Sequence, residues 1–180
     1  MRTVLLVAAG HGMILGAVQV SAAARFTGIA GMLYAALSAG SLAGAVTLGT
    51  RLQSGRPAGR LAALTAICGV VLSVASVTTS PIAFATALVA LGACLGPAGV
   101  IGFGLVGRLG PDGRTVEAFT MLTATGLGAI AVGAGVAGVA VDRFGPAAVL
   151  LVAGAAAIIL TTLVIARRRS LPAAGEQSVV

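Results

Sequence analysis

The chain has 180 residues, of which 58% are hydrophobic and 8% are charged, with a formal net charge of +7 and a mean hydropathy of +1.12. Soluble domains contain about 25% charged residues, so this chain lacks the polar surface that a soluble enzyme, a nucleic-acid-binding domain or a disordered chain requires. It also lacks the alternation of apolar and polar residues over about 10 positions that is typical of membrane β-strands. We therefore expect an all-α integral membrane protein.

Five stretches contain no arginine, aspartate or glutamate, and they cover residues 3–24, 26–50, 61–107, 118–141 and 144–166. A helix that crosses the bilayer needs about 20 mostly apolar residues, so four of these stretches fit one helix each. The longest stretch has room for two helices, and Thr78-Thr79-Ser80-Pro81 inside it is a turn signal in which the proline begins the next helix. The sequence predicts six transmembrane helices, over 3–23, 28–50, 60–78, 81–107, 116–140 and 146–166. Together they make one domain over 1–169, and the polar tail over 170–180 is expected to be disordered in the cytoplasm.

All eleven basic residues are arginines, and their distribution predicts the orientation of the chain. With the loops assigned alternately to the two sides, Arg25 and Arg143 fall on one side and the other nine arginines on the opposite side. Because cytoplasmic loops carry the excess of basic residues, we expect a multi-pass cell-membrane protein with both termini in the cytoplasm. The positive charge then predicts contact with anionic lipids of the bilayer and no binding of nucleic acid.

Small residues four positions apart occur in the first and fourth predicted helices, and again in the second and fifth. They are Gly12 and Gly16, matched by Gly92 and Gly96, and Gly40 and Gly44, matched by Ala134 and Gly138. Small residues at this spacing lie on one helix face and allow neighbouring backbones to approach closely. Because a unit of three helices has an odd number of crossings, two such units in one chain run in opposite directions. The sequence therefore predicts two inverted three-helix repeats, an arrangement found in many secondary transporters.

Charged and aromatic motifs flank the fifth predicted helix. It begins with Arg114-Thr-Val-Glu117-Ala-Phe119 and ends with Gly138-Val-Ala-Val-Asp142-Arg143-Phe144-Gly145-Pro146. These segments resemble the start of the eleventh helix and the Gly-x-x-x-Asp-Arg-x-Gly loop of major facilitator superfamily transporters, in particular of the drug and sugar efflux branches. Gly96-Pro97 resembles the broken tenth helix of that superfamily. The segment from Arg51 to Arg60 lies where its basic cytoplasmic loop would be, although the acidic residue of that motif is absent.

This resemblance maps the chain onto the carboxy-terminal six of twelve transporter helices. It implies a cavity between two six-helix halves that opens alternately to each side of the membrane, and hence transport of a small-molecule substrate, by efflux. The 180 residues account for one half, so the chain would pair with a second six-helix half or form a homodimer. Two alternatives stay open, namely a six-helix accessory protein that does not transport and an inactive truncated product.

Polar residues inside membrane helices usually face a cavity or a partner. His11 and Gln19 lie about 80° apart around the first helix and about 12 Å apart along it, so they share one broad face and are candidates for the substrate pathway. Tyr34 and Ser38 form a polar stripe with Ser41 on the second helix and are further candidates. The alternative for all of them is hydrogen bonding to neighbouring helices or backbone.

The fourth predicted helix carries one more pathway candidate and a candidate hinge. Cys94 is expected at mid-membrane, as is Cys68 on the third helix. Pro97 removes one helical hydrogen bond, so Gly96 and Pro97 are expected to form a hinge, with a static kink as the alternative.

Four charged residues lie at predicted helix ends. Arg114 and Glu117 are candidates for a cytoplasmic pair that latches one transport state, and Asp142 and Arg143 for a brace of the last turn. The alternative is that these charges are merely solvated at the interface. No enzyme motif, metal-binding motif or cofactor-binding loop occurs in the sequence, so we expect no catalytic residue, no metal and no cofactor.

Overall fold

The computed structural model describes residues 2–49, 57–109 and 114–167. Arg51, Arg56 and the expected tail over 170–180 lie outside the described residues. Within the described ranges the chain is helical apart from short connections. The elements are α1 (Arg2–Arg25), the short 3-10 helix η1 (Thr27–Ile29), α2 (Ala30–Gly44), the π-helical turn η2 (Ala45–Gly49), α4 (Pro57–Val77), α5 (Pro81–Leu109) and α6 (Thr115–Ala166).

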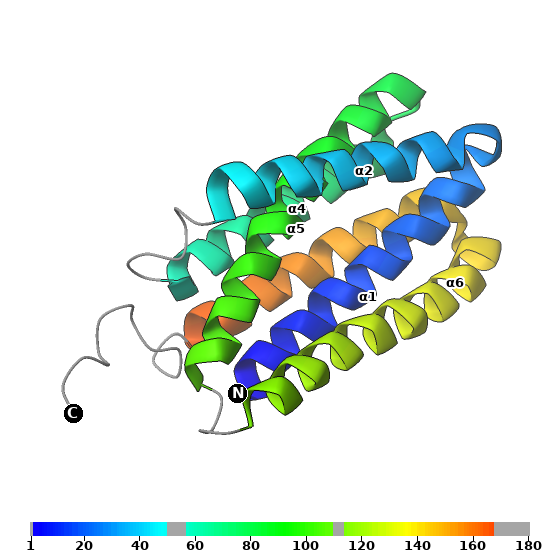
Figure 1. Ribbon diagram of the computed structural model, residues 1–180. Helices are drawn as coiled ribbons and strands as arrows, with labels where there is room; N and C mark the ends of the chain where they lie inside the picture. Colours follow the sequence, from blue (N-terminus) through cyan, green and yellow to red (C-terminus); the bar gives the residue numbers. More distant parts are fainter. Residues whose placement is uncertain (1, 50–56, 110–113, 168–180) are drawn as a thin grey trace, which may run out of the picture.

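Five helical segments in the described chain are long and apolar enough to cross a membrane: Thr3–Arg25, Thr27–Gly49, Ala58–Val77, Pro81–Arg108 and Thr115–Ala166. The helices lie alongside one another as a bundle (Figure 1). Large apolar side chains such as Met32, Ile82 and Val152 are exposed on its outside, as expected where the surrounding solvent is lipid. The expectation of an all-helical protein with helices suited to a membrane is confirmed.

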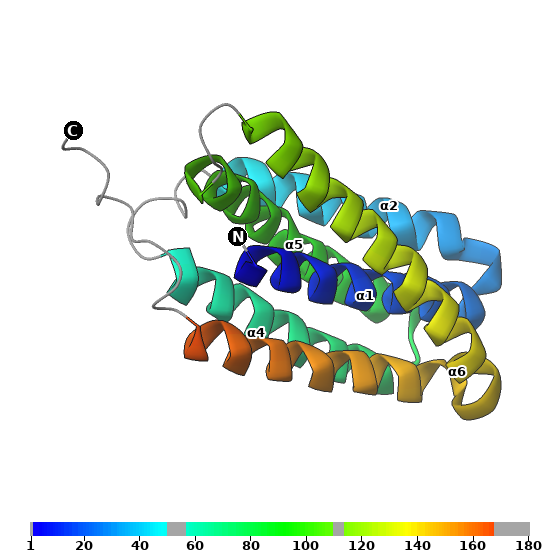
Figure 2. The same cartoon turned by 90° about the horizontal axis from the view of Figure 1, so that it is seen from below.

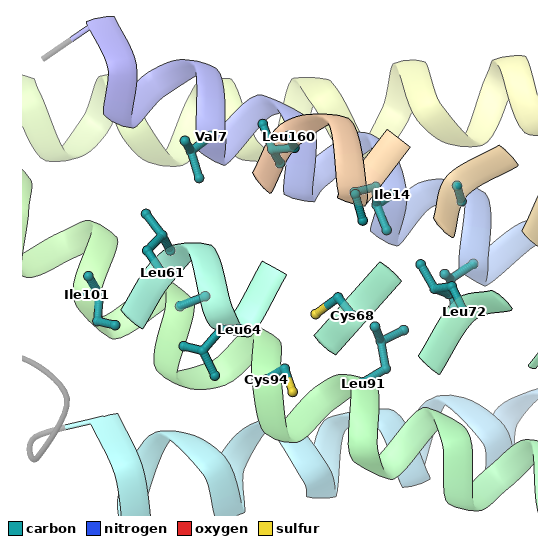
Figure 3. Packing of buried hydrophobic residues seen from close by; sticks show 14 of the residues in the cluster. Val7, Ile14, Leu61, Leu64, Cys68, Leu72, Leu91, Cys94, Ile101 and Leu160 are labelled. Atoms are coloured by element: carbon teal, nitrogen blue, oxygen red, sulfur yellow. The ribbon is translucent and has the colours of Figure 1, made fainter. Parts of the chain in front are cut away.

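The core of the bundle lies where α1, α4, α5 and the second part of α6 meet. Figure 3 shows their side chains converging, with Ile14 from α1, Leu72 from α4, Leu91 from α5 and Leu160 from α6 all buried. Leucine and valine dominate this cluster because they fill the space between helices without introducing polar atoms.

The last helix, α6, reverses its direction at Gly145. This glycine has φ 79° and ψ 161°, a backbone conformation that is essentially restricted to glycine, and Pro146 then begins the next helical segment in a favoured position. Figures 1 and 2 show α6 folding back at this point. The kink at Gly145 lies between the predicted helices over 116–140 and 146–166, and Asp142 and Arg143 belong to the helical segment before it.

Two pairs of helices approach each other so closely that only glycine fits between them. On α5, a Cβ at Gly92 would overlap the carbonyl oxygen of Leu37 in α2, and a Cβ at Gly96 that of Ser41. In the same interface, Gly44 of α2 faces the backbone of Ala93. Backbone contact of this kind brings many atoms into van der Waals range, which is the main attraction available between helices in lipid.

The second close pair consists of α1 and the first part of α6. A Cβ at Gly12 would lie 2.6 Å from the carbonyl oxygen of Gly126, and a Cβ at Gly16 would overlap that of Ile130. From the opposite side, Gly133 faces the backbone of Met13. The expected role of Gly138 in such a contact is wrong, since no atom lies within 4 Å of its added Cβ. Gly133 takes that role, because close packing follows the face of α6 that points toward α1.

A third contact joins α4 to the second part of α6. A Cβ at Gly69 would lie 3.0 Å from the carbonyl oxygen of Gly154, and a Cβ at Gly154 would lie 3.0 Å from that of Gly69. The two glycines therefore face one another, which lets these helices cross at close range.

At one end of the bundle, Arg25 joins three helices. Its guanidinium donates to the carbonyl of Ser76 at 2.9 Å and to that of Ala75 at 3.5 Å, two acceptors in the last turn of α4. The guanidinium carbon also lies 5.9 Å from the ring centre of Phe26 and 6.0 Å from that of Phe84 in α5. This end of α4 is thus held by a charge-assisted contact and two cation–π contacts.

We expect Gly92→Ala to lower the free energy of unfolding by about 1–3 kcal/mol, because the new methyl group would overlap the backbone of α2. Thermal unfolding of the purified protein in detergent measures this change. Gly99→Ala on the same helix is the matched control, since no atom lies within 4 Å of its added Cβ and alanine is the better helix former. Equal loss of stability in both variants would contradict the close approach of α2 and α5.

Candidate functional site

A groove runs along the bundle between α1, α2, α5 and the first part of α6. It consists of two open hollows with volumes of about 370 and 560 Å³, and we call it the central groove. The hollows adjoin one another, because both are lined by Leu15, Ser41, Leu95, Gly99 and Phe103. Gly99 and Gly102 of α5 leave open space in the groove, since no atom lies within 4 Å of an added Cβ at either position.

Three of the five pathway candidates lie in the central groove. His11 lines the smaller hollow, and Gln19 and Ser38 line the larger one. Ser41 borders both hollows, and Thr123 of α6 adds one more hydroxyl to the smaller hollow. His11 and Gln19, which were expected on one broad face of the first helix, thus line different hollows of the groove.

Of all the polar side chains in the groove, His11 has the best-defined surroundings. Its Nε2 lies 3.0 Å from Oγ1 of Thr65 in α4. The Thr65 hydroxyl donates its proton to the carbonyl of Leu61 at 2.8 Å. A hydroxyl has one proton to donate, so it accepts the hydrogen bond from His11. We infer that the imidazole carries its proton on Nε2, which leaves Nδ1 as the acceptor nitrogen.

Several polar groups in the groove keep their hydrogen-bonding capacity free. Hydroxyls on helices commonly donate to a carbonyl of the preceding turn, as Thr65 and Thr123 do. Within the described residues, the hydroxyls of Ser38 and Ser41, the side-chain amide of Gln19 and Nδ1 of His11 form no hydrogen bond. Such groups would be costly against lipid, so they need water, a ligand or a partner protein.

The other two pathway candidates lie outside the groove. The hydroxyl of Tyr34 donates to the backbone carbonyl of Gln19 at 2.7 Å, so this side chain links α2 to α1, the alternative role considered for it. Cys94 is buried and packs in the core beside Cys68 of α4 (Figure 3). The face of α5 that lines the groove carries Leu95 and Gly99, and Cys94 lies on another face of this helix.

The two residues of the candidate hinge lie in different surroundings. Gly96 lines the groove and also contacts the backbone of Ser41, whereas Pro97 is buried. Because proline has no N–H, the carbonyl of Ala93 lacks its usual helical donor. That carbonyl lies against Gly44 of α2, and α5 continues through Pro97 as one helix.

The four charged candidates behave differently from one another. Arg114 and Glu117 form a two-point ion pair, with both nitrogen–oxygen distances at 2.7 Å. The pair lies within one turn at the start of α6 and both side chains are about two-thirds exposed, at 67% and 64%, so it joins no second helix and contributes little stability. Asp142 and Arg143 are exposed and form no ion pair with described residues, so the bend depends on Gly145 instead of a charged brace.

Two groove-related residues, Thr65 and Phe103, were not anticipated from the sequence. Thr65 is a lone hydroxyl in an apolar helix, and its pairing with His11 depends on how α1 packs against α4. Phe103 borders both hollows and stacks on Phe119 of α6 with ring centres 5.9 Å apart. An aromatic residue among glycines, as at 102–104, is the signal that would have indicated a wall of this kind.

No cluster of three or more metal-ligating side chains occurs among the described residues. No protein-family model, curated protein or solved structure matches this chain. The geometry of the central groove is therefore the basis for a functional proposal.

We expect the ring of His11 to be neutral and protonated at Nε2. The chain contains one histidine, so ¹⁵N NMR of histidine-labelled protein in lipid nanodiscs reports on this ring alone. Thr65→Val removes the acceptor and should shift the equilibrium between the two ring tautomers. Thr161→Val is the control, because that hydroxyl bonds to Ala157 of its own helix. A ring protonated mainly at Nδ1 would show that the assigned hydrogen bond is wrong.

Proposed function

We propose that this chain is one six-helix half of a membrane transporter that moves a small molecule through the central groove by efflux. The observation that carries the proposal is an open groove with unpartnered polar side chains inside an otherwise apolar bundle. The proposed relationship is with the carboxy-terminal half of major facilitator superfamily transporters, which the motifs around α6 resemble.

Six membrane crossings are part of this proposal, with α6 supplying two of them. A straight helix of 52 residues would be about 78 Å long, far more than the hydrocarbon thickness of about 30 Å. The reversal at Gly145 divides it into two segments that are each long enough to cross. An even number of crossings, combined with the distribution of arginines, favours both termini in the cytoplasm.

The glycine contacts support two inverted three-helix repeats. If α6 supplies the fifth and sixth helices, α5 is the first helix of the second repeat. The first helix of each repeat carries two glycines that are four residues apart. These glycines contact two backbone carbonyls, also four residues apart, on the second helix of the other repeat. These are Gly92 and Gly96 against Leu37 and Ser41, and Gly12 and Gly16 against Gly126 and Ile130.

The reverse contacts follow the same rule. Gly44 meets Ala93, the residue after Gly92, and Gly133 meets Met13, the residue after Gly12. The remaining helices, α4 and the second part of α6, meet through Gly69 and Gly154, which face one another symmetrically. A two-fold relation between the repeats accounts for all three contacts.

The position of the groove supports the same function. It lies between α1 and α5, the first helices of the two proposed repeats, which is where the resemblance implies a transport pathway. Because its polar groups are open on one side of the bundle, a second six-helix half or a second copy of the chain is needed to shield them from lipid.

Cysteine labelling from each side of the membrane tests the six crossings. In a chain with Cys68→Ala and Cys94→Ala, a membrane-impermeant maleimide added to intact cells should label Arg143→Cys. Ala166→Cys should be labelled only after the membrane is opened, because the second segment of α6 returns to the cytoplasm. Labelling of Ala166→Cys in intact cells would mean that α6 crosses once.

Transport of a neutral lipophilic dye that carries one phenolic hydroxyl, 2-hydroxy Nile red, tests the proposed function. Cells expressing the chain should accumulate less dye than control cells. Gly126→Leu should abolish this difference, because Gly126 lines the groove and its added side chain would fill it. Gly128→Leu should preserve the difference, since Gly128 lies outside the groove and has equal space around it.

The mass of the purified particle in mild detergent separates the proposal from its alternative. A transporter half should purify as a dimer or with a second half. A particle of 17.3 kDa that moves no dye would favour the accessory protein over the transporter.

A further inference from the structure

The central groove is lined mainly by apolar side chains, with a few polar groups on both of its sides. α1 packs on α6, and this side carries His11, Gln19 and Thr123. α2 packs on α5, and this side carries Ser38 and Ser41. Large apolar side chains lie among them, namely Leu15, Leu37, Leu95, Phe103, Leu122, Leu127 and Ile130. A mostly apolar groove with a few polar groups is complementary to a molecule that is itself amphipathic.

No charged side chain lines this groove among the described residues. The two acidic side chains in the described chain, Glu117 and Asp142, both lie on exposed ends of helical segments. The groove therefore offers no counter-ion for a cation or an anion, and a charged ligand would lose its hydration without compensation. An uncharged ligand carries no such penalty.

The hydrogen-bonding state of His11 determines which hydrogen bonds the smaller hollow can form with a ligand. Nε2 donates to Thr65, so a neutral ring presents Nδ1 as an acceptor. The Thr123 hydroxyl donates its proton to the backbone carbonyl of Phe119, so it can only accept a hydrogen bond from a ligand. Both polar groups with a defined state in the smaller hollow are acceptors, so a ligand at this position needs a hydrogen-bond donor.

The ring of Phe103 favours a flat ligand in the groove. Its side chain is 46% exposed and borders both hollows. Its stacking on Phe119, with ring centres 5.9 Å apart, occupies one face of the ring and holds its orientation. Flat apolar groups pack well against the exposed part of such a ring.

We propose that the central groove binds an uncharged, planar, amphipathic molecule that donates a hydrogen bond to Nδ1 of His11 and lies against Phe103. This rests on the proposed function, because it takes the groove as the substrate site of the transporter and names the class of substrate. Neither a sugar without an apolar face nor an organic ion has this combination of properties.

Three matched probes test the chemistry of the site. Protein labelled with ¹⁵N-histidine in nanodiscs is titrated with 2-naphthol, with 2-methoxynaphthalene, which lacks the donor, and with 2-naphthoate, which is charged. We expect 2-naphthol alone to move the Nδ1 resonance of His11 to a saturating value. An unmoved resonance, an equal effect of the methoxy compound, or a larger effect of the carboxylate would each overturn the proposal.

Variants locate the binding in the groove. Gly126→Leu should remove the 2-naphthol effect, and Gly128→Leu should retain it. Phe103→Ala should raise the half-saturating concentration about fivefold, the fold-change that corresponds to loss of one aromatic pair. This variant keeps the test valid if Gly126→Leu does not fold. An unchanged half-saturating concentration in Phe103→Ala would refute the contact with that ring.

The outcome is separable from that of the transport assay. Saturable binding of 2-naphthol by a protein that moves no 2-hydroxy Nile red would uphold the binding site and reject the transporter. Dye efflux without any response of His11 would uphold the transporter and reject this substrate class.

Discussion

The direct approach of helix backbones at glycine is the constraint on which the rest of the fold depends. In lipid, apolar side chains gain little by leaving their surroundings, so helices associate mainly through close packing. Gly92 and Gly96 bring α5 onto α2, and Gly12 and Gly16 bring α1 onto α6. Because each contact uses up one helix face, the remaining faces of α1 and α5 stay apart and border the central groove. The groove is therefore a consequence of where the helices touch.

The same constraint explains which polar groups are satisfied. Tyr34 lies where α2 comes close to α1, and its hydroxyl reaches a backbone carbonyl. His11 reaches Thr65 because α1 also contacts α4. Ser38 and Ser41 line the larger hollow of the groove, and their hydroxyls form no hydrogen bond within the described chain. Polar side chains thus mark the border between closed interfaces and the open groove.

Much of the fold was predictable from the sequence, because long uncharged apolar runs determine where helices cross. The predicted helix over 81–107 corresponds to Pro81–Leu109, and that over 3–23 corresponds to Arg2–Arg25. The helical state of Asp142 and Arg143 does not follow from their charge, because charged residues occur both in loops and at the ends of membrane helices. The roles of Gly133 and Thr65 also escaped prediction. Both depend on which face of a helix meets a neighbour, and a composition rich in glycine and threonine gives no unique answer to that question.

The connections at one end of the bundle are short. At the end where Arg25 lies, the helical segments are joined by one residue at Phe26, three residues over 78–80 and the single turn at Gly145. Helix ends that are joined so closely have little freedom to separate, and the contacts of Arg25 hold them together further. Any change in the spacing of the helices is therefore smallest at this end of the bundle.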